Sequence, residues 1–364
     1  MPQTQDAAVA PITYWMLLQE TPETLEQKLH APSEEAARWV EAAAHNGSKP
    51  AIVNWGQMLL DGRGVGRDAE AALRWFCIAA DAGYPDGINM VGRCYELGWG
   101  VEPDVAKAAR YYRAAAETGH HWARFNLGSL LLKSEGIERD VQNALSLFVQ
   151  SARQGNAKAM NMIGRFCEEG WHGRVKFAAA MRWYARAANR GCFRGQFHLA
   201  RFLFAQGSTV QATQRLTESL NAAPPDFCRD AAAMLEGHAD EDLRRLFLHA
   251  LWRACASGEA ADFLRYARAL AENCHGMPPE DSLHWLRRAA IAGNAEALAE
   301  LKRCGAPLPS CSTWNTRLSA QLRSTASLAR RRLVRCVRLG IWRLRERTRF
   351  GSPAQRRLVE GEPP

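Results

Sequence analysis

The chain has 364 residues, of which 47% are hydrophobic and 23% charged, a balance typical of a folded soluble protein. Its net charge is +9. In residues 312–364, thirteen arginines and three glutamates give about +10, which leaves about −1 for the rest and makes the tail the only strongly basic part. No apolar run reaches the ~18–20 residues that span a bilayer, and the first ten residues lack the basic start of a signal peptide. These features exclude a membrane-spanning protein and predict a cytoplasmic one, which the tail could also hold at a membrane surface.

Small residues recur at a fixed spacing through the first half of the chain. One column, at intervals of 36 residues, is Gly47, Gly83, Gly119, Gly155 and Gly191. A second column in the same register is Gly56, Gly92, Gly128, Gly164 and then Ala200. Several columns in one register define a tandem repeat, and the repeat period predicts the fold. Four full units follow, at 48–83, 84–119, 120–155 and 156–191.

Each unit contains the pattern of two helices. The first helix has apolar residues on one face, as in Trp55, Met58 and Leu59. A glycine in the middle of that helix costs about 1 kcal/mol against alanine. Its recurrence predicts a neighbouring helix too close for a Cβ atom. Aspartates 68, 104 and 140 are expected to cap the second helix, and the closing glycine of each unit is expected to end it.

The segments GWGVEPD at 98–104 and AKAARYYRAAAETG at 106–119 resemble the Sel-one-like repeat (SLR), a relative of the tetratricopeptide repeat. The resemblance covers residues 33–191. It implies an all-α fold, a right-handed α-solenoid (superhelix) of antiparallel helix pairs with 36-residue repeats. Members of the family commonly serve as adaptors. A hydrolytic role has been proposed for some secreted, cysteine-paired relatives, but this chain lacks regularly placed cysteines.

The pattern divides the chain into four parts. Residues 1–32 are expected to form a lead-in with a capping helix, and residues 33–224 the SLR, tetratricopeptide-like solenoid. Residues 225–305 are expected to form divergent helical repeats, since the motif returns at Ser282–Gly293. Residues 306–364 are a proline linker and an arginine-rich amphipathic tail. We expect about six to seven units in all.

Nothing in the sequence indicates catalysis. The Gly62–Arg67 segment is similar to a phosphate-binding loop but follows a helix and not a strand. Cys274-His275 lacks a second pair of metal ligands at a useful spacing. The ten cysteines are interpreted mostly as small apolar core residues in a reducing compartment. We therefore predict a protein that is not an enzyme and uses no cofactor or metal.

Related arrays line their concave side with the first helix of each pair. The non-core positions of these helices form columns of amide, arginine, aromatic and methionine side chains, which suit a peptide backbone, a carboxylate or apolar groups. The candidate partner-binding residues are Asn54, Gln57, Asn89, Arg93, Asn126, Asn161, Arg165, His198 and Arg201. The predicted ligand is an extended peptide or a partner protein. The alternative is a plain solvated helix face.

The basic tail has three interpretations. It could lie on an anionic membrane with Trp342 inserted, bind the phosphates of nucleic acid, or have no dedicated ligand. The residues expected to make the contacts are Arg330, Arg331, Arg335, Arg338, Trp342 and Arg345. We therefore predict a protein-interaction scaffold. The alternative is a peripheral membrane or nucleic-acid-associated adaptor anchored through this helix.

Overall fold

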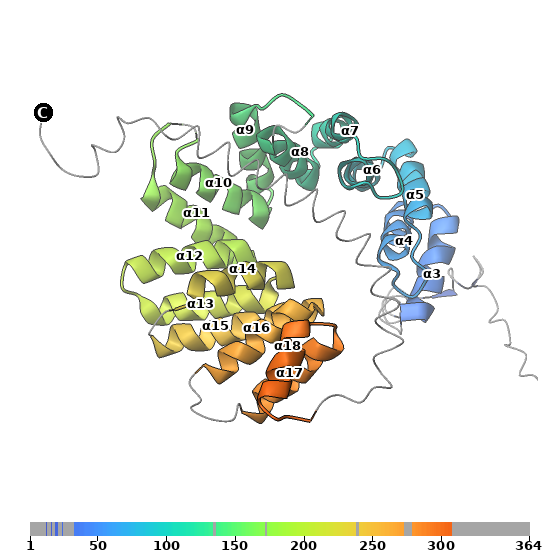
Figure 1. The fold of residues 1–364 in the computed structure, drawn as a ribbon. Helices are drawn as coiled ribbons and strands as arrows, with labels where there is room; N and C mark the ends of the chain where they lie inside the picture. Colours follow the sequence, from blue (N-terminus) through green and yellow to red (C-terminus); the bar gives the residue numbers. More distant parts are fainter. Residues whose placement is uncertain are drawn as a thin grey trace, which may run out of the picture. The chain divides into compact units, whose positions relative to one another are not determined.

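The structure is a computed structural model that describes residues 33–133, 136–171, 173–237, 240–272 and 279–307, and also residues 12, 16, 19, 20 and 24. Within these ranges it contains sixteen α-helices and no strand (Figure 1). Successive helices pack in pairs, so the predicted all-α solenoid is confirmed. The chain forms two compact units, Met1–Ala223 and Pro224–Pro364.

From Ser33 on, the described part of the first unit contains a single helix followed by five helix pairs. The single helix is α3 (Ser33–His45). The pairs are α4 (Lys49–Asp61) with α5 (Ala69–Asp81), α6 (Pro85–Leu97) with α7 (Val105–Glu117), α8 (His121–Lys133) with α9 (Val141–Arg153), α10 (Ala157–Glu169) with α11 (Phe177–Asn189), and α12 (Phe193–Ala205) with α13 (Thr209–Ala222). In each of the first four pairs, the second helix also packs against the first helix of the following pair. Each pair therefore covers the apolar side of its neighbour.

The helix ends follow the predicted chemistry. The carboxylates of Asp68, Asp104 and Asp140 accept hydrogen bonds from backbone N–H groups three residues later, at 2.8–2.9 Å. Lys176 stands at the same place in α11 and provides no such cap. The closing glycines at 47, 83, 119, 155 and 191 all have positive φ, between 71° and 94°. This left-handed conformation strains other residues, so the predicted role of the glycine column in ending the helices is confirmed.

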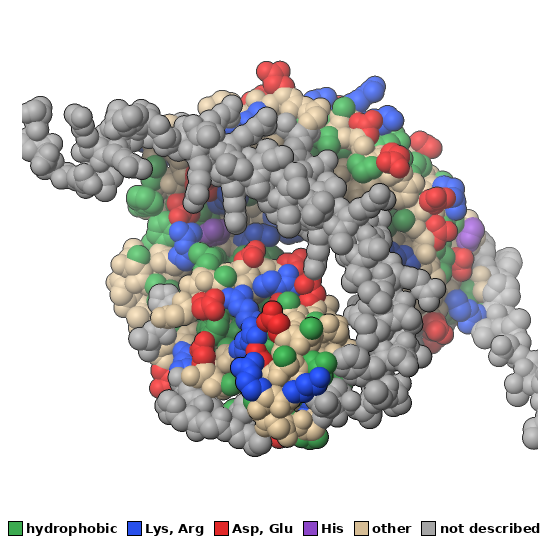
Figure 2. Space-filling model, viewed as in Figure 1, with side chains coloured by type: hydrophobic (Ala, Val, Ile, Leu, Met, Phe, Trp, Pro, Cys, Tyr) green, Lys and Arg blue, Asp and Glu red, His purple; other side chains and the backbone are tan. Residues whose placement is uncertain are grey.

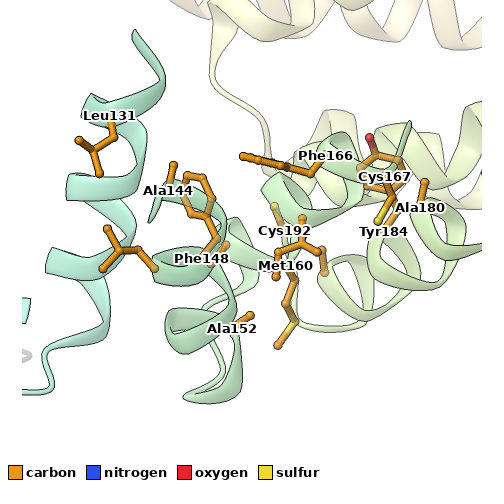
Figure 3. Packing of buried hydrophobic residues seen from close by; sticks show 14 of the residues in the cluster. Leu131, Ala144, Phe148, Ala152, Met160, Phe166, Cys167, Ala180, Tyr184 and Cys192 are labelled. Carbon is orange, nitrogen blue, oxygen red and sulfur yellow. The ribbon is translucent and has the colours of Figure 1, made fainter. Parts of the chain in front are cut away.

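The glycines inside the first helices make room for an aromatic ring from the second helix of the same pair. A Cβ atom built on them would lie 2.5, 2.8, 3.1 and 2.5 Å from the rings of Phe76, Tyr112, Phe148 and Tyr184, for Gly56, Gly92, Gly128 and Gly164 in that order. All four rings are fully buried. Figure 3 shows two of them, Phe148 and Tyr184, packed between helices of the array. The predicted close approach is confirmed, and the group that approaches is a side-chain ring.

The four rings alternate between phenylalanine and tyrosine, and a second position alternates with them. Tyr112 and Tyr184 donate their buried hydroxyls to the carboxylates of Glu96 and Glu168, at 2.7 and 2.6 Å. The phenylalanine pairs have leucine at the position of the glutamate, Leu60 and Leu132. A buried hydroxyl needs a hydrogen-bond partner and a phenyl ring does not. The first four pairs therefore alternate with a structural period of two repeats.

The second unit contains five described α-helices. They are α14 (Pro225–Leu235), α15 (Glu241–Ala254), α16 (Ala260–Ala271), α17 (Glu280–Ile291) and α18 (Ala295–Arg303), with a short 3-10 turn, η1 (Cys255–Ser257). Helix α14 packs against α15, and an apolar cluster connects α16 with α17. The Ser282–Gly293 motif forms α17 and its closing turn, in which Gly293 has a φ of 92°.

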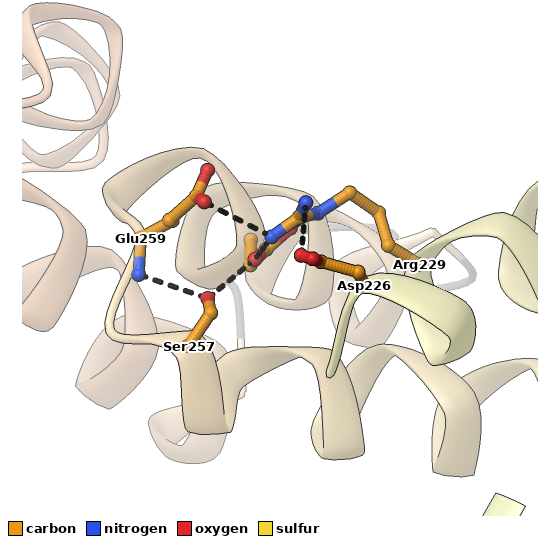
Figure 4. Close-up of polar contacts among 5 residues, drawn as sticks. Asp226, Arg229, Ser257 and Glu259 are labelled. Atoms are coloured by element: carbon orange, nitrogen blue, oxygen red, sulfur yellow. Dashed lines mark hydrogen bonds and ion pairs between the residues drawn. The ribbon is translucent and has the colours of Figure 1, made fainter. Parts of the chain in front are cut away.

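An ion-pair network joins α14 to α16 in this unit (Figure 4). The Arg229 guanidinium donates to both carboxylate oxygens of Asp262, at 2.7 and 2.6 Å. The Ser257 hydroxyl donates to the same carboxylate at 2.7 Å. Asp262 is buried, and these hydrogen bonds replace the water that its charge has lost.

Candidate partner-binding face

Some first helices of neighbouring pairs contact one another. In the first unit α4 contacts α6, and α10 contacts α12. In the described part of the chain, no two second helices of successive pairs have contacts as extensive as these. This difference supports placing the first helices on the inner side of the array. We call the residues of α4, α6, α8, α10 and α12 that face away from the second helices the inner wall.

Three arginines of one predicted column are held by neighbouring side chains. Arg93 lies over the ring of Trp99, with its guanidinium carbon 4.7 Å from the ring centroid. Arg165 lies over Trp171 in the same way, at 5.1 Å, and pairs with Glu169 at 2.9 Å. Ring stacking and ion pairs reduce the freedom of a long side chain. These arginines are therefore partly ordered before any ligand arrives.

Arg201 takes part in a network across two repeats. It pairs with Glu168 of α10 at 3.1 Å and contacts Nδ1 of His198 at 3.0 Å. The imidazole of His198 stacks on the Tyr184 ring, with a centroid distance of 4.7 Å. Glu168 also accepts the Tyr184 hydroxyl, so its carboxylate connects the core to the wall.

The amide columns divide into exposed and buried members. Asn54 is exposed and Gln57 is half-buried, with its amide bonded to Asp61 at 2.9 Å. Asn126 donates to Oδ1 of Asn89 in the preceding repeat, at 2.9 Å. Asn89 and Asn161 are 6% and 3% exposed, so they lie beneath the surface of the wall. Oδ1 of Asn161 is buried without a hydrogen-bond partner among the described residues.

Burial, and to a smaller extent the nearby Arg201 charge, lower the pKa of His198 to about 4. The unfolded chain protonates this histidine near pH 6.5. Between pH 6.5 and 4 the unfolded state therefore binds more protons, and stability falls as pH falls. We expect the loss to be on the order of 2 kcal/mol.

Denaturant unfolding of the chain and of the His198→Asn variant, measured from pH 7 to pH 4.5, checks this expectation. Asparagine is the residue that two other repeats have in this column, at 54 and 126. The variant should lose less stability on acidification than the parent chain does. Parallel curves for the two proteins would contradict the assignment.

Several predictions concern residues outside the described ranges. The tail residues Arg330, Arg331, Arg335, Arg338, Trp342 and Arg345 lie there, as does most of the lead-in at 1–32. None of the described helices combines the length and the hydrophobicity that crossing a bilayer requires. No group of three or more His, Cys, Asp or Glu side chains in the described ranges could hold a metal ion.

Two features of this region escaped the sequence pattern. The tryptophans that hold Arg93 and Arg165 lie 72 residues apart, at 99 and 171, and only a search at twice the repeat period would have found them. The expectation that only the tail is strongly basic is also incomplete. Residues 170–217 contain eight basic residues and no acidic one, which a sliding charge count would have shown.

Comparison with known proteins matches the geometry. The family model of the Sel1 repeat matches residues 49–84, 85–120, 123–156, 157–192 and 278–294. These are Sel1 repeats. The first four matches each cover one helix pair, from α4 to α11, and the fifth covers α17. No curated protein matches the chain.

A solved structure of a Sel1 repeat protein has the same fold over part of this chain. A Sel1 repeat protein from Oxalobacter formigenes is 22% identical, with a TM-score of 0.54 over 63% of this chain and 98% of that one. A protective antigen of uropathogenic Escherichia coli with an SLR fold is 25% identical, with a TM-score of 0.47 over 81% of this chain and 67% of that one. Sel1 repeat proteins are generally protein-interaction scaffolds.

Proposed function

We propose that the chain is a non-catalytic scaffold that binds an extended peptide or a segment of a partner protein along the inner wall. The observation that carries this proposal is the set of arginines at 93, 165 and 201. They occupy one column of the repeat, and each is held in place by an aromatic ring or a carboxylate. A guanidinium that is already positioned loses less entropy when it binds a ligand.

The wall offers chemistry suited to a polypeptide. Guanidinium groups bind carboxylates with two parallel hydrogen bonds. The amide of Asn54 is exposed, and such groups can both donate to and accept from a peptide backbone. A chain lying along successive first helices would meet the same groups once per repeat, which gives affinity through several modest contacts.

The groups whose pKa values shift most are suited to packing and not to catalysis. Burial raises the pKa of the Cys94 and Cys255 thiols to about 12, which keeps them protonated and poorly nucleophilic at neutral pH. Burial also raises the pKa of the Tyr112 and Tyr184 hydroxyls, each of which donates to a glutamate. In this proposal these residues stabilise the array, and the inner wall binds the ligand.

The test uses peptides selected against the full-length chain from a displayed random library. Replacing Arg93, Arg165 and Arg201 together by alanine should lower the affinity for wall-binding peptides by at least about tenfold, since it removes up to three charge-assisted contacts. The matched control replaces Arg74, Arg110 and Arg182, which are exposed and occupy one column of the second helices.

Both variants lose three positive charges, so a general electrostatic effect would weaken binding equally in the two. Preserved helicity and melting temperature show that the variants fold. Equal affinities for the parent chain and the first-helix variant would reject the inner wall as the binding site.

A further inference from the structure

Phe177 is more exposed than the residues at the same position in the three preceding second helices. It begins α11, as Ala69, Val105 and Val141 begin the three preceding second helices. Those three residues are half-buried, whereas Phe177 is 61% exposed. The largest apolar side chain of the column is therefore the one most open to solvent.

The cause is a shorter turn in the following repeat. In earlier repeats, the turn between the two helices packs on the start of the preceding second helix. Gly100 lies so close to the backbone of Ala69 that a Cβ atom would overlap it, and a Cβ on Gly136 would lie 3.2 Å from Val105. The turns at 62–68, 98–104 and 170–176 each have seven residues between helices. The turn between α12 and α13 has only residues 206–208, so the covering segment is missing beside Phe177.

Further apolar side chains are exposed around the starts of α11 and α13. The neighbour of the Phe177 ring is Phe202 of α12, with a centroid distance of 6.2 Å. Val175, just before α11, is 48% exposed, and Val210, in the first turn of α13, is 82% exposed. We call Val175, Phe177, Phe202 and Val210 the uncovered edge.

The charge around this edge has one sign. Residues 170–217 include Arg174 and Lys176 beside Phe177, and they contain no aspartate or glutamate. The bordering acids are already paired: Glu168 with Arg201, Glu169 with Arg165, and Glu218 with Arg215. The second unit differs, because basic and acidic side chains lie next to one another over its visible face in Figure 2. Arg268, for example, pairs there with Glu296 and Glu300.

We propose that the uncovered edge binds an acidic polypeptide segment that places an apolar side chain against Phe177. The geometry favours a polypeptide, since in two earlier repeats a turn of the chain itself covers this position, over Ala69 and over Val105. The positive surroundings favour carboxylates next to the apolar contact. The choice of a protein partner rests on the proposed scaffold function, but the edge and the inner wall consist of different residues.

The experiment selects peptides from a displayed random library against the full-length chain. The affinity of each selected peptide is then measured for the parent chain and for variants of the edge. Peptides that bind the edge should be rich in Asp or Glu together with aliphatic or aromatic residues. Phe177→Ser should lower the affinity for these peptides at least about tenfold, as expected for a central apolar anchor. The Lys176→Glu variant should weaken them too, whereas Arg110→Glu, an equal charge change on α7, should not.

Folding of each variant is checked by circular dichroism and thermal unfolding. A second approach replaces residues 206–208 with the seven-residue sequence of 62–68, which should cover Phe177 and block the same peptides. The Arg93→Ala variant, which removes a guanidinium of the inner wall but leaves the ion pairs of Glu168 and Glu169 intact, should keep edge binding, which separates this inference from the inner wall.

Three results would overturn the proposal. One is a selection that yields no acidic–apolar peptides, or only peptides indifferent to Phe177→Ser. The others are binding of a single-stranded oligonucleotide or of phosphatidylserine vesicles that depends on Phe177 and exceeds peptide binding. Those outcomes would assign the edge to nucleic acid or to a membrane instead.

Discussion

Gly164→Ala should destabilise the first unit by about 1–3 kcal/mol, although alanine is the better helix former by about 1 kcal/mol. The added Cβ atom would lie 2.5 Å from a ring carbon of Tyr184. That ring is fully buried and bonded to Glu168, so it has no free direction in which to move. Overpacking should therefore outweigh helix propensity. Denaturant unfolding of the two proteins measures the difference.

The fifth helix pair provides the control for this prediction. There the glycine position holds Ala200, and the ring position, counted from the buried Ala212, holds Leu216. Combining Gly164→Ala with Tyr184→Leu copies that pair. The double variant should lose less stability than the two single losses added together, with a coupling of about 1–2 kcal/mol. Simple additivity would mean that the glycine and the ring do not compete for space.

Arg229→Met should destabilise the second unit by about 3–5 kcal/mol, because it leaves the buried Asp262 carboxylate without its main partner. The Ser257 hydroxyl alone does not balance that charge. Methionine keeps much of the side-chain volume, so the loss reports on charge and not on a cavity. Denaturant unfolding followed by circular dichroism measures the effect.

Arg245→Met is the matched control in the same unit. Arg245 pairs with Glu241 at a similar distance, 2.7 Å, but both side chains are more than 70% exposed. Exposed pairs contribute about 0–1 kcal/mol, so this variant should be nearly neutral. Similar losses for the two variants would show that the Arg229 network is no more important than a surface ion pair.

The fold could be read from the sequence because each repeat supplies the same signals in the same order. Glycines at 56, 92, 128 and 164 and aspartates at 68, 104 and 140 each have a local physical reason, and their spacing makes the reasons consistent. Local signals of this kind need no knowledge of distant contacts.

The candidate site was harder to predict because its residues depend on contacts between repeats. Asn89 is buried and bonded to Asn126, and helix periodicity alone does not show which polar side chain lies beneath its neighbour. The exposure of Phe177 depends on a turn about thirty residues later, and no single-repeat pattern includes it. The positions of Arg93 and Arg165 depend on tryptophans shared only by alternate repeats.

We propose that the first helices present the surface that binds a polypeptide partner. Photocrosslinking tests it most directly, with a benzoylphenylalanine placed in separate variants at 57 or 129 on first helices and at 74 or 110 on second helices. Gln57 and Ser129 share the column of Arg93 and Arg165, and all four positions are at least partly exposed. We expect a library-selected, wall-binding peptide to form adducts at 57 and 129 and not at 74 or 110. Adducts confined to the second-helix positions would contradict binding along the inner wall.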